Sequence, residues 1–102
     1  MSQYILLTIY QYTSTIVRIM DKRLKYLINS LLAIKTDKAM YDFLLGILTP
    51  RELQELPLRL EIVKLLKQGV PQHRIAETLG TGVATVTRGS KEIQKGRFKN
   101  II

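Results

Sequence analysis

The side chains best suited to chemistry in this chain are short hydroxyl and methyl groups followed by cations, on a segment that begins just after Gly80. Such groups are small enough to approach base edges in the major groove of DNA, and the cations can neutralise phosphates. No acidic residue occurs between Glu77 and Glu92, whereas a purely structural helix pair usually carries Glu and Lys outside. The pattern favours a DNA-binding surface, with outward residues Thr81, Ala84, Thr85, Arg88 and Lys91.

A helix-turn-helix over about residues 71–93 would position these side chains. Gly80 occupies the point where the chain must turn sharply with a positive φ, a conformation that costs glycine least. Apolar residues on either side have the spacing of two inward helix faces. We expect the second helix to reach about Gln94 and to stop at Gly96. The inward residues are Ile75, Ala76 and Leu79 in the first helix, with Val83 and Val86 beginning the stripe of the second.

The charge is concentrated in the same part of the chain. The 102 residues give room for one domain and carry a formal net charge of +8. From Lys67 onward, seven cations face two acids. A cationic surface around a helix-turn-helix favours a polyanionic partner, and counterion release would make the affinity fall as salt rises. Double-stranded DNA is therefore the predicted partner.

The residue types of the chain give little support to catalysis or metal binding. The chain has no cysteine and a single histidine, His73, so a disulfide framework and a thiolate metal site are excluded. It also lacks a catalytic triad, a zinc-binding helix motif and a phosphate-binding glycine loop. We predict a cytoplasmic protein that is not an enzyme, has no catalytic residue and binds no metal.

Two amphipathic helices are expected upstream. Apolar residues from Leu24 to Ile34 keep helical spacing, which indicates core or partner-helix packing. Thr36 or Asp37 can cap the next helix. We expect the stripe of that helix to be core; its residues are Met40, Phe43, Leu44, Ile47 and Leu48.

A strong helix start follows at Thr49. Thr49 can cap, Pro50 suits the first helical position, and Glu52 completes a capping box. Pro57 lacks an N–H, so we expect it to kink or break the run, giving two helices rather than one before Gly69 ends it.

Residues 1–19 differ in composition from the rest, being rich in β-branched and aromatic residues with one charge, Arg18. Polar residues interrupt them too often for a membrane span of roughly 20 apolar residues, and no cation precedes them as in a secretory signal. Three interpretations stay open: an extra helix or strand over the core, a dimer-forming arm, or sequence translated upstream of a natural start at Met20. We treat residues 20–96 as the domain and 97–102 as a basic and apolar tail.

Several motifs together resemble the Trp repressor family. The run Val83-Ala84-Thr85-Val86-Thr87-Arg88-Gly89-Ser90 after a glycine turn is far more specific than a general helix-turn-helix. The resemblance is best from about Leu48 to Ser90 and weaker back to Leu24. It also rests on Leu48-Thr49-Pro50, on Arg59 before Ile62-Val63, and on Gly69, Gln72 and Gly80.

The resemblance implies an all-α, multi-helix fold that contains the helix-turn-helix and forms an intertwined homodimer. Each subunit would present one recognition helix to half of a palindromic operator, as a transcriptional repressor does. Val83, Ala84 and Thr87 would approach base edges. Gln72, His73 and Thr85 would lie near phosphates or the groove edge.

The resemblance also implies a pocket for L-tryptophan, or a related small molecule, as corepressor; no other cofactor is expected. Arg88 would pair with the ligand carboxylate, Arg59 would stack on the indole, and Thr49 would lie at the pocket wall. Glu92 stands where the family's tryptophan-binding member has a serine near the ligand amino group. This carboxylate could pair with an ammonium, or it could cap Arg88 and close the pocket.

Further departures from the family are Leu58 beside the pocket arginine, and Pro71 and His73 at the start of the first motif helix. No counterpart of the family's last helix is expected. Two other functions stay open on the sequence alone. One is a DNA-targeting helix-turn-helix module of a mobile-element system. The other is a helical interaction protein whose N-terminal segment binds a partner or a membrane surface; our prediction is the repressor, with no membrane partner.

Overall fold

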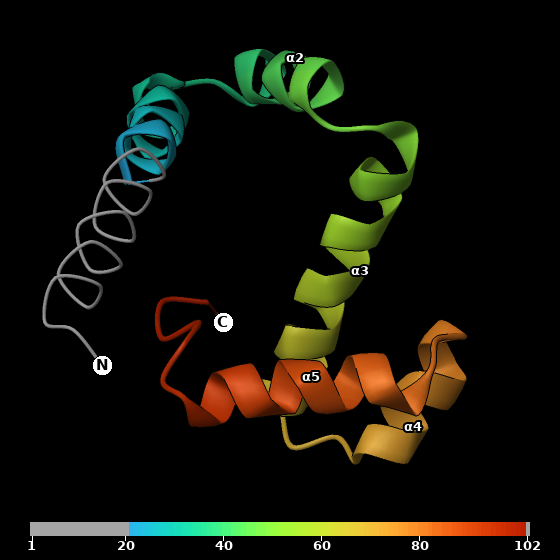
Figure 1. Cartoon of the computed structure of the whole chain (residues 1–102). Helices are drawn as coiled ribbons and strands as arrows, with labels where there is room; N and C mark the ends of the chain where they lie inside the picture. The colour runs from blue at the N-terminus through green and yellow to red at the C-terminus, as the bar shows by residue number, and fades with distance from the viewer. Residues whose placement is uncertain (1–20, 102) are drawn as a thin grey trace, which may run out of the picture. The chain divides into compact units, whose positions relative to one another are not determined.

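The computed structural model describes residues 21–101, and within that range it contains helices and their connections but no strand. Residues 21–33 are helical, and four labelled helices follow (Figure 1). The predicted all-α fold is thereby confirmed. The interpretations of residues 1–19 lie outside the described residues. The labelled helices are α2 (Asp37–Ile47), α3 (Pro50–Lys67), α4 (Gln72–Leu79) and α5 (Val83–Gln94).

The chain divides into two units, with the boundary between Phe43 and Leu44. In the first unit, the Thr36 hydroxyl oxygen accepts the N–H of Ala39 at 3.1 Å, so Thr36 is the residue that caps α2. None of the residues of α2 is buried in the single chain. The prediction that the α2 stripe is core is therefore wrong for one chain, because an 11-residue helix has too few neighbours there to cover its apolar face.

Helix α3 begins at the predicted capping box. The Thr49 hydroxyl oxygen accepts the N–H of Glu52 at 3.2 Å, and the Glu52 carboxylate accepts the N–H of Thr49 at 2.9 Å. The predicted break at Pro57 is wrong, because α3 continues without interruption through Lys67. Pro57 lies on the exposed side of α3, and the helix loses one backbone donor there. The capping box stabilises α3 before Pro57, and the buried residues Ile62 and Val63 stabilise it after Pro57.

The second unit is built around the C-terminal half of α3, against which α4 and α5 pack (Figure 1). Ile62, Ile75 and Val86 are 1%, 0% and 0% exposed, and each comes from a different helix. Ala76 joins this cluster, as its small size predicts for a close helix crossing. Half-buried residues complete the core: Leu58, Leu65, Leu66, Val70 and Leu79.

The turn between α4 and α5 has the geometry that Gly80 predicts. Gly80 is left-handed, with φ 63°, and the N–H of Thr81 donates to the Ala76 carbonyl at 3.0 Å. Helix α5 then begins at Val83, so Thr81 lies in the turn rather than on the helix as predicted. The predicted end of α5 is confirmed, since the helix reaches Gln94 and Gly96 has φ 91°.

Candidate DNA-binding surface and ligand pocket

Helix α5 has one buried face and one exposed face. Val86 is 0% exposed, whereas Val83 is 53% exposed. The inward position predicted for Val83 is therefore wrong, because Val83 is the first residue of α5, where the core cluster around Val86 does not cover the helix. Val83 instead belongs to the outer side of α5, together with Ala84 and Lys91, which are exposed as well.

A shallow groove follows this outer side. Three cations lie along it and Glu92 is the acid among its lining residues, so the groove is net positive. Methyl groups lie in the first turn of α5 and cations in its last two turns. This order would allow contacts with base edges and then with phosphates. The groove is lined by Val83, Ala84, Thr87, Arg88, Lys91, Glu92 and Lys95.

Gln72 and Thr87, both named from the sequence, are in direct contact. The Thr87 hydroxyl donates to the Gln72 side-chain oxygen at 2.8 Å, and the pair is half-buried. Gln72 is the first residue of α4, and His73 follows it on the exposed side of the same turn. The hydrogen bond therefore fixes the start of α4 to the middle of α5.

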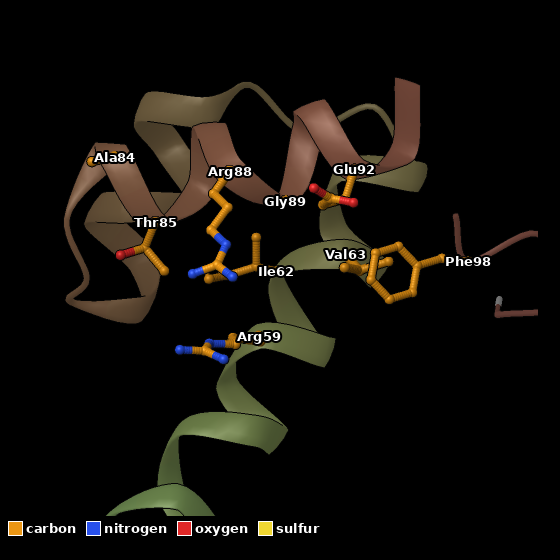
Figure 2. A pocket seen from close by; sticks show the side chains of 9 residues that line it. All are labelled: Arg59, Ile62, Val63, Ala84, Thr85, Arg88, Gly89, Glu92 and Phe98. Carbon is orange, nitrogen blue, oxygen red and sulfur yellow. The ribbon is translucent and has the colours of Figure 1, made fainter. Parts of the chain in front are cut away.

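A pocket of about 390 Å³ lies between α3 and α5. The side chains of Arg59 and Arg88 extend into it from the two helices, and Glu92 and Phe98 lie near Val63 (Figure 2). Apolar atoms form the floor and cationic groups the rim, an arrangement that suits a flat apolar molecule bearing a carboxylate. The lining residues are Arg59, Ile62, Val63, Ala84, Thr85, Arg88, Gly89, Glu92 and Phe98.

The structure brings together three of the four residues predicted for the ligand. Arg59, Arg88 and Glu92 line the pocket, while Thr49 is not among its lining residues and caps α3 instead. Thr85 and Ala84, predicted for DNA, line this pocket too, so α5 contributes to both sites from neighbouring positions.

Glu92 pairs with cations outside the pocket. Its carboxylate lies 3.2 Å from the Lys95 ammonium and 3.5 Å from the Arg97 guanidinium. Of the two roles weighed for Glu92, capping of Arg88 is not observed. The Arg59 guanidinium is 4.0 Å from Glu55, at the limit of an ion pair.

Phe98 was not predicted as a site residue, because residues 97–102 were treated only as a basic and apolar tail. Phe98 has a left-handed φ of 62° and lines the pocket. The Lys67 ammonium donates to the carbonyl oxygens of Phe98 and Ile101, which ties the tail to the end of α3. An aromatic residue between Arg97 and Lys99 was the available signal.

Within residues 21–101, the acidic and histidine side chains form no group of three that could bind a metal ion. Helices of the described part are also too short or too polar to cross a membrane.

A family model described as Trp repressor protein matches residues 22–101. The chain belongs to the Trp repressor family. Members of this family are DNA-binding regulators, which confirms the prediction that this chain is not an enzyme.

Individual relatives support the same membership. The chain is 32% identical over 79 residues to the uncharacterized protein YerC of Bacillus subtilis, covering 78% of this chain and 76% of YerC. It is 46% identical over 54 residues to a Trp operon repressor homolog of Actinobacillus succinogenes, covering 52% and 54% of the two chains. A Trp operon repressor homolog of Vibrio vulnificus is 43% identical over 60 residues, covering 57% and 59%. The match thus spans little more than half of these repressor homologs. No solved structure matches the chain.

Proposed function

We propose that this protein is a sequence-specific transcriptional repressor that reads double-stranded DNA with α5. The proposal rests on the difference in exposure between the two sides of α5. Val86 anchors the helix in the core with no exposed surface, while Val83 on the outer side is 53% exposed. A helix held in this way presents its outer residues at a fixed height above the domain, as insertion into a major groove requires.

The charge of the same region supports a nucleic-acid partner. Arg88, Lys91 and Lys95 lie along the groove on α5. Lys91 and Lys95 would contact phosphates, and Thr87 and Ala84 would meet base edges beside them.

The proposed repressor is a homodimer that binds a palindromic operator. A single chain leaves many large apolar side chains in water, on the helix of residues 21–33, on α2 and on α3. A second copy would cover such a surface on both subunits at once. The exposed residues are Leu24, Tyr26, Ile28, Leu32, Tyr41, Leu45, Ile47, Leu56 and Leu60.

We also propose that the pocket between α3 and α5 binds a small aromatic carboxylate, such as L-tryptophan or a related molecule, as corepressor. Arg88 would pair with the carboxylate and Arg59 would cover the ring. Such a ligand would affect DNA binding by favouring one orientation of α5 on α3, because it contacts both helices.

The test is a binding selection on random duplex DNA with the full chain, at fixed ionic strength, with and without L-tryptophan. We expect enrichment of a palindromic sequence, and a change in affinity for it when L-tryptophan is added. Equal binding with and without L-tryptophan would remove the corepressor and keep the repressor. Absence of any enriched sequence would overturn both.

A further inference from the structure

We propose that Gln72 determines which bases Thr87 can read. By accepting the hydroxyl proton of Thr87, Gln72 leaves the Thr87 oxygen able only to accept hydrogen bonds. The pair would then select a base that offers an amino group in the major groove, adenine or cytosine, over one that offers a keto oxygen, guanine or thymine. This inference rests on the proposed function, because it concerns the same DNA-binding surface.

The hydrogen bond on which this depends is unusual in the described part of the chain. It joins two side chains 15 residues apart on different helices, at 2.8 Å. The other side-chain to side-chain hydrogen bonds among the described residues, Arg51 to Glu55 and Lys95 to Glu92, are local and exposed. Local bonds of that kind follow from helix geometry, whereas the contact between Gln72 and Thr87 requires α4 and α5 to be docked.

The core holds the two partners at this distance. Ile75 and Ala76, one turn along α4 from Gln72, are buried in the same cluster as Val86, the neighbour of Thr87. Rotation of α4 or α5 that broke the hydrogen bond would therefore also disrupt the core. Both partners are half-buried, which limits the alternative positions of the Gln72 side chain.

The chemistry of the two groups decides the direction of reading. A threonine hydroxyl has one proton and two lone pairs, so once the proton is donated to Gln72 the oxygen can only accept. Adenine N6 and cytosine N4 donate in the major groove, whereas guanine O6 and thymine O4 accept. A hydroxyl oxygen with no proton to donate is repelled by a keto oxygen but accepts a hydrogen bond from an amino group.

Thr87 is placed to do this. It lines the groove on the outer side of α5 together with Ala84 and Lys91, so its half-buried side chain borders the surface that would face DNA. The amide nitrogen of Gln72 keeps its two protons, which remain available for a phosphate oxygen. Gln72 is thus a positioning residue for Thr87.

The experiment compares sequence preferences of full-length variants on a random duplex library at fixed ionic strength. Gln72→Glu keeps an acceptor in place and removes the amide protons; Thr87→Ser keeps the hydroxyl. Gln72→Ala frees the Thr87 proton, and Thr87→Val removes the hydroxyl. Matched controls on exposed positions are Gln54→Ala on α3 and Thr78→Val on α4. Circular dichroism melting establishes that each variant is folded.

We expect the wild type to favour adenine or cytosine at one position of each half-site. The preference over guanine or thymine should be roughly 2- to 12-fold, as one neutral hydrogen bond gives. Gln72→Glu and Thr87→Ser should keep this preference, although the first would bind less tightly overall because of its added negative charge. Gln72→Ala and Thr87→Val should lose it, and the two controls should match the wild type.

Other results would overturn the inference. A guanine or thymine preference that Thr87→Val removes would mean that the hydroxyl donates to DNA. A Gln72→Ala profile equal to that of the wild type would mean that Gln72 plays no part. Failure of the wild type to bind any duplex would overturn the proposed function.

Melting of the free protein tests the hydrogen bond without DNA. The Tm shifts of Gln72→Ala and Thr87→Val should be non-additive in the double variant, because both remove the same bond. Additive shifts would contradict the contact itself, whatever the DNA result.

Discussion

Gly89 on α5 lies against Ile62 on α3 so closely that a Cβ atom on Gly89 would stand 3.3 Å from the Cγ2 atom of Ile62. The same atom would lie 3.4 Å from the Cδ1 atom of Leu66. Glycine therefore lets α5 approach α3 at the point where the floor of the pocket meets the core. The closeness of this crossing sets the height of the outer side of α5 and the separation of Arg59 from Arg88 across the pocket.

Gly89→Val should lower stability by about 1–3 kcal/mol, because its methyl groups would have to displace Ile62 and Leu66 in a packed core. Thermal melting measures this. A matched control is Gly46→Ala on α2, where a Cβ atom would meet nothing within 4 Å and helix propensity should add about 0.5–1 kcal/mol. A Gly89→Val protein as stable as the wild type would show that the close approach is unimportant.

Val86→Ala and Val83→Ala make the same chemical change on opposite faces of α5. The first should destabilise by about 1.5–3 kcal/mol because Val86 is fully buried. The second should change stability by less than about 0.5 kcal/mol and should weaken binding to the selected duplex, because Val83 is exposed. Denaturant unfolding and a DNA-binding titration separate the two effects. Equal destabilisation by both substitutions would contradict the orientation of α5.

The capping box of α3 should make stability depend on pH in the acid range. The backbone N–H of Thr49 and then its hydroxyl hydrogen-bond the Glu52 carboxylate and hold the pKa of Glu52 below its ordinary value of 4.5. A pKa lowered by folding contributes stability above the unfolded value, and this contribution is lost as the pH falls through the folded value. The Tm advantage of wild type over Glu52→Gln should therefore shrink below about pH 4.5. Parallel Tm profiles from pH 7 to 3 would contradict this role.

The ion pairs of Glu92 indicate which charged group of a ligand the pocket favours. Because Lys95 and Arg97 already neutralise Glu92, a ligand ammonium gains little from it, whereas Arg88 can still pair with a carboxylate. Calorimetry should show indole-3-propionate binding at least as tightly as L-tryptophan, and tryptamine more weakly.

Two variants check the assignment of charges in the pocket. Arg88→Gln should weaken the binding of indole-3-propionate and of L-tryptophan roughly 10- to 150-fold, the range of a charge-assisted hydrogen bond. Glu92→Gln should leave indole-3-propionate binding almost unchanged. Tryptamine binding that exceeds that of indole-3-propionate would assign the pocket to cations instead.

Local patterns of the sequence predicted most of the second unit. The spacing of Ile75, Ala76 and Leu79, the turn at Gly80 and the capping box at Thr49 each depend on a few adjacent residues, and each is confirmed. Gly96 likewise follows the end of α5.

The features that were not predicted from the sequence depend on tertiary contacts. Val83 carries an apolar side chain, but its exposure depends on whether the core cluster covers the first turn of α5. Pro57 was expected to break α3, but the flanking cap and core residues keep the helix continuous. Phe98 lines the pocket in a tail that Lys67, far away in sequence, holds by hydrogen bonds. The bond between Gln72 and Thr87 likewise exists only once two helices have docked.

The dimer has its own test. Light scattering of the full chain should give the mass of two copies, and Leu45→Glu should shift it towards one, because Leu45 lies on the exposed apolar surface of α2. Lys38→Glu, on an exposed polar position of the same helix, is the control. A wild type with the mass of one copy would contradict the proposed dimer.

The central claim is that the outer side of α5 reads duplex DNA, and a salt titration of affinity tests it most directly. Binding of the wild type, Lys91→Gln and Thr87→Val is measured on the selected duplex and on a scrambled duplex over a series of salt concentrations. We predict that Lys91→Gln weakens binding to both duplexes alike and lowers the salt slope by about 1, whereas Thr87→Val loses about 0.5–1.5 kcal/mol on the selected duplex alone. Equal affinity of the wild type for the two duplexes at physiological ionic strength would contradict the account.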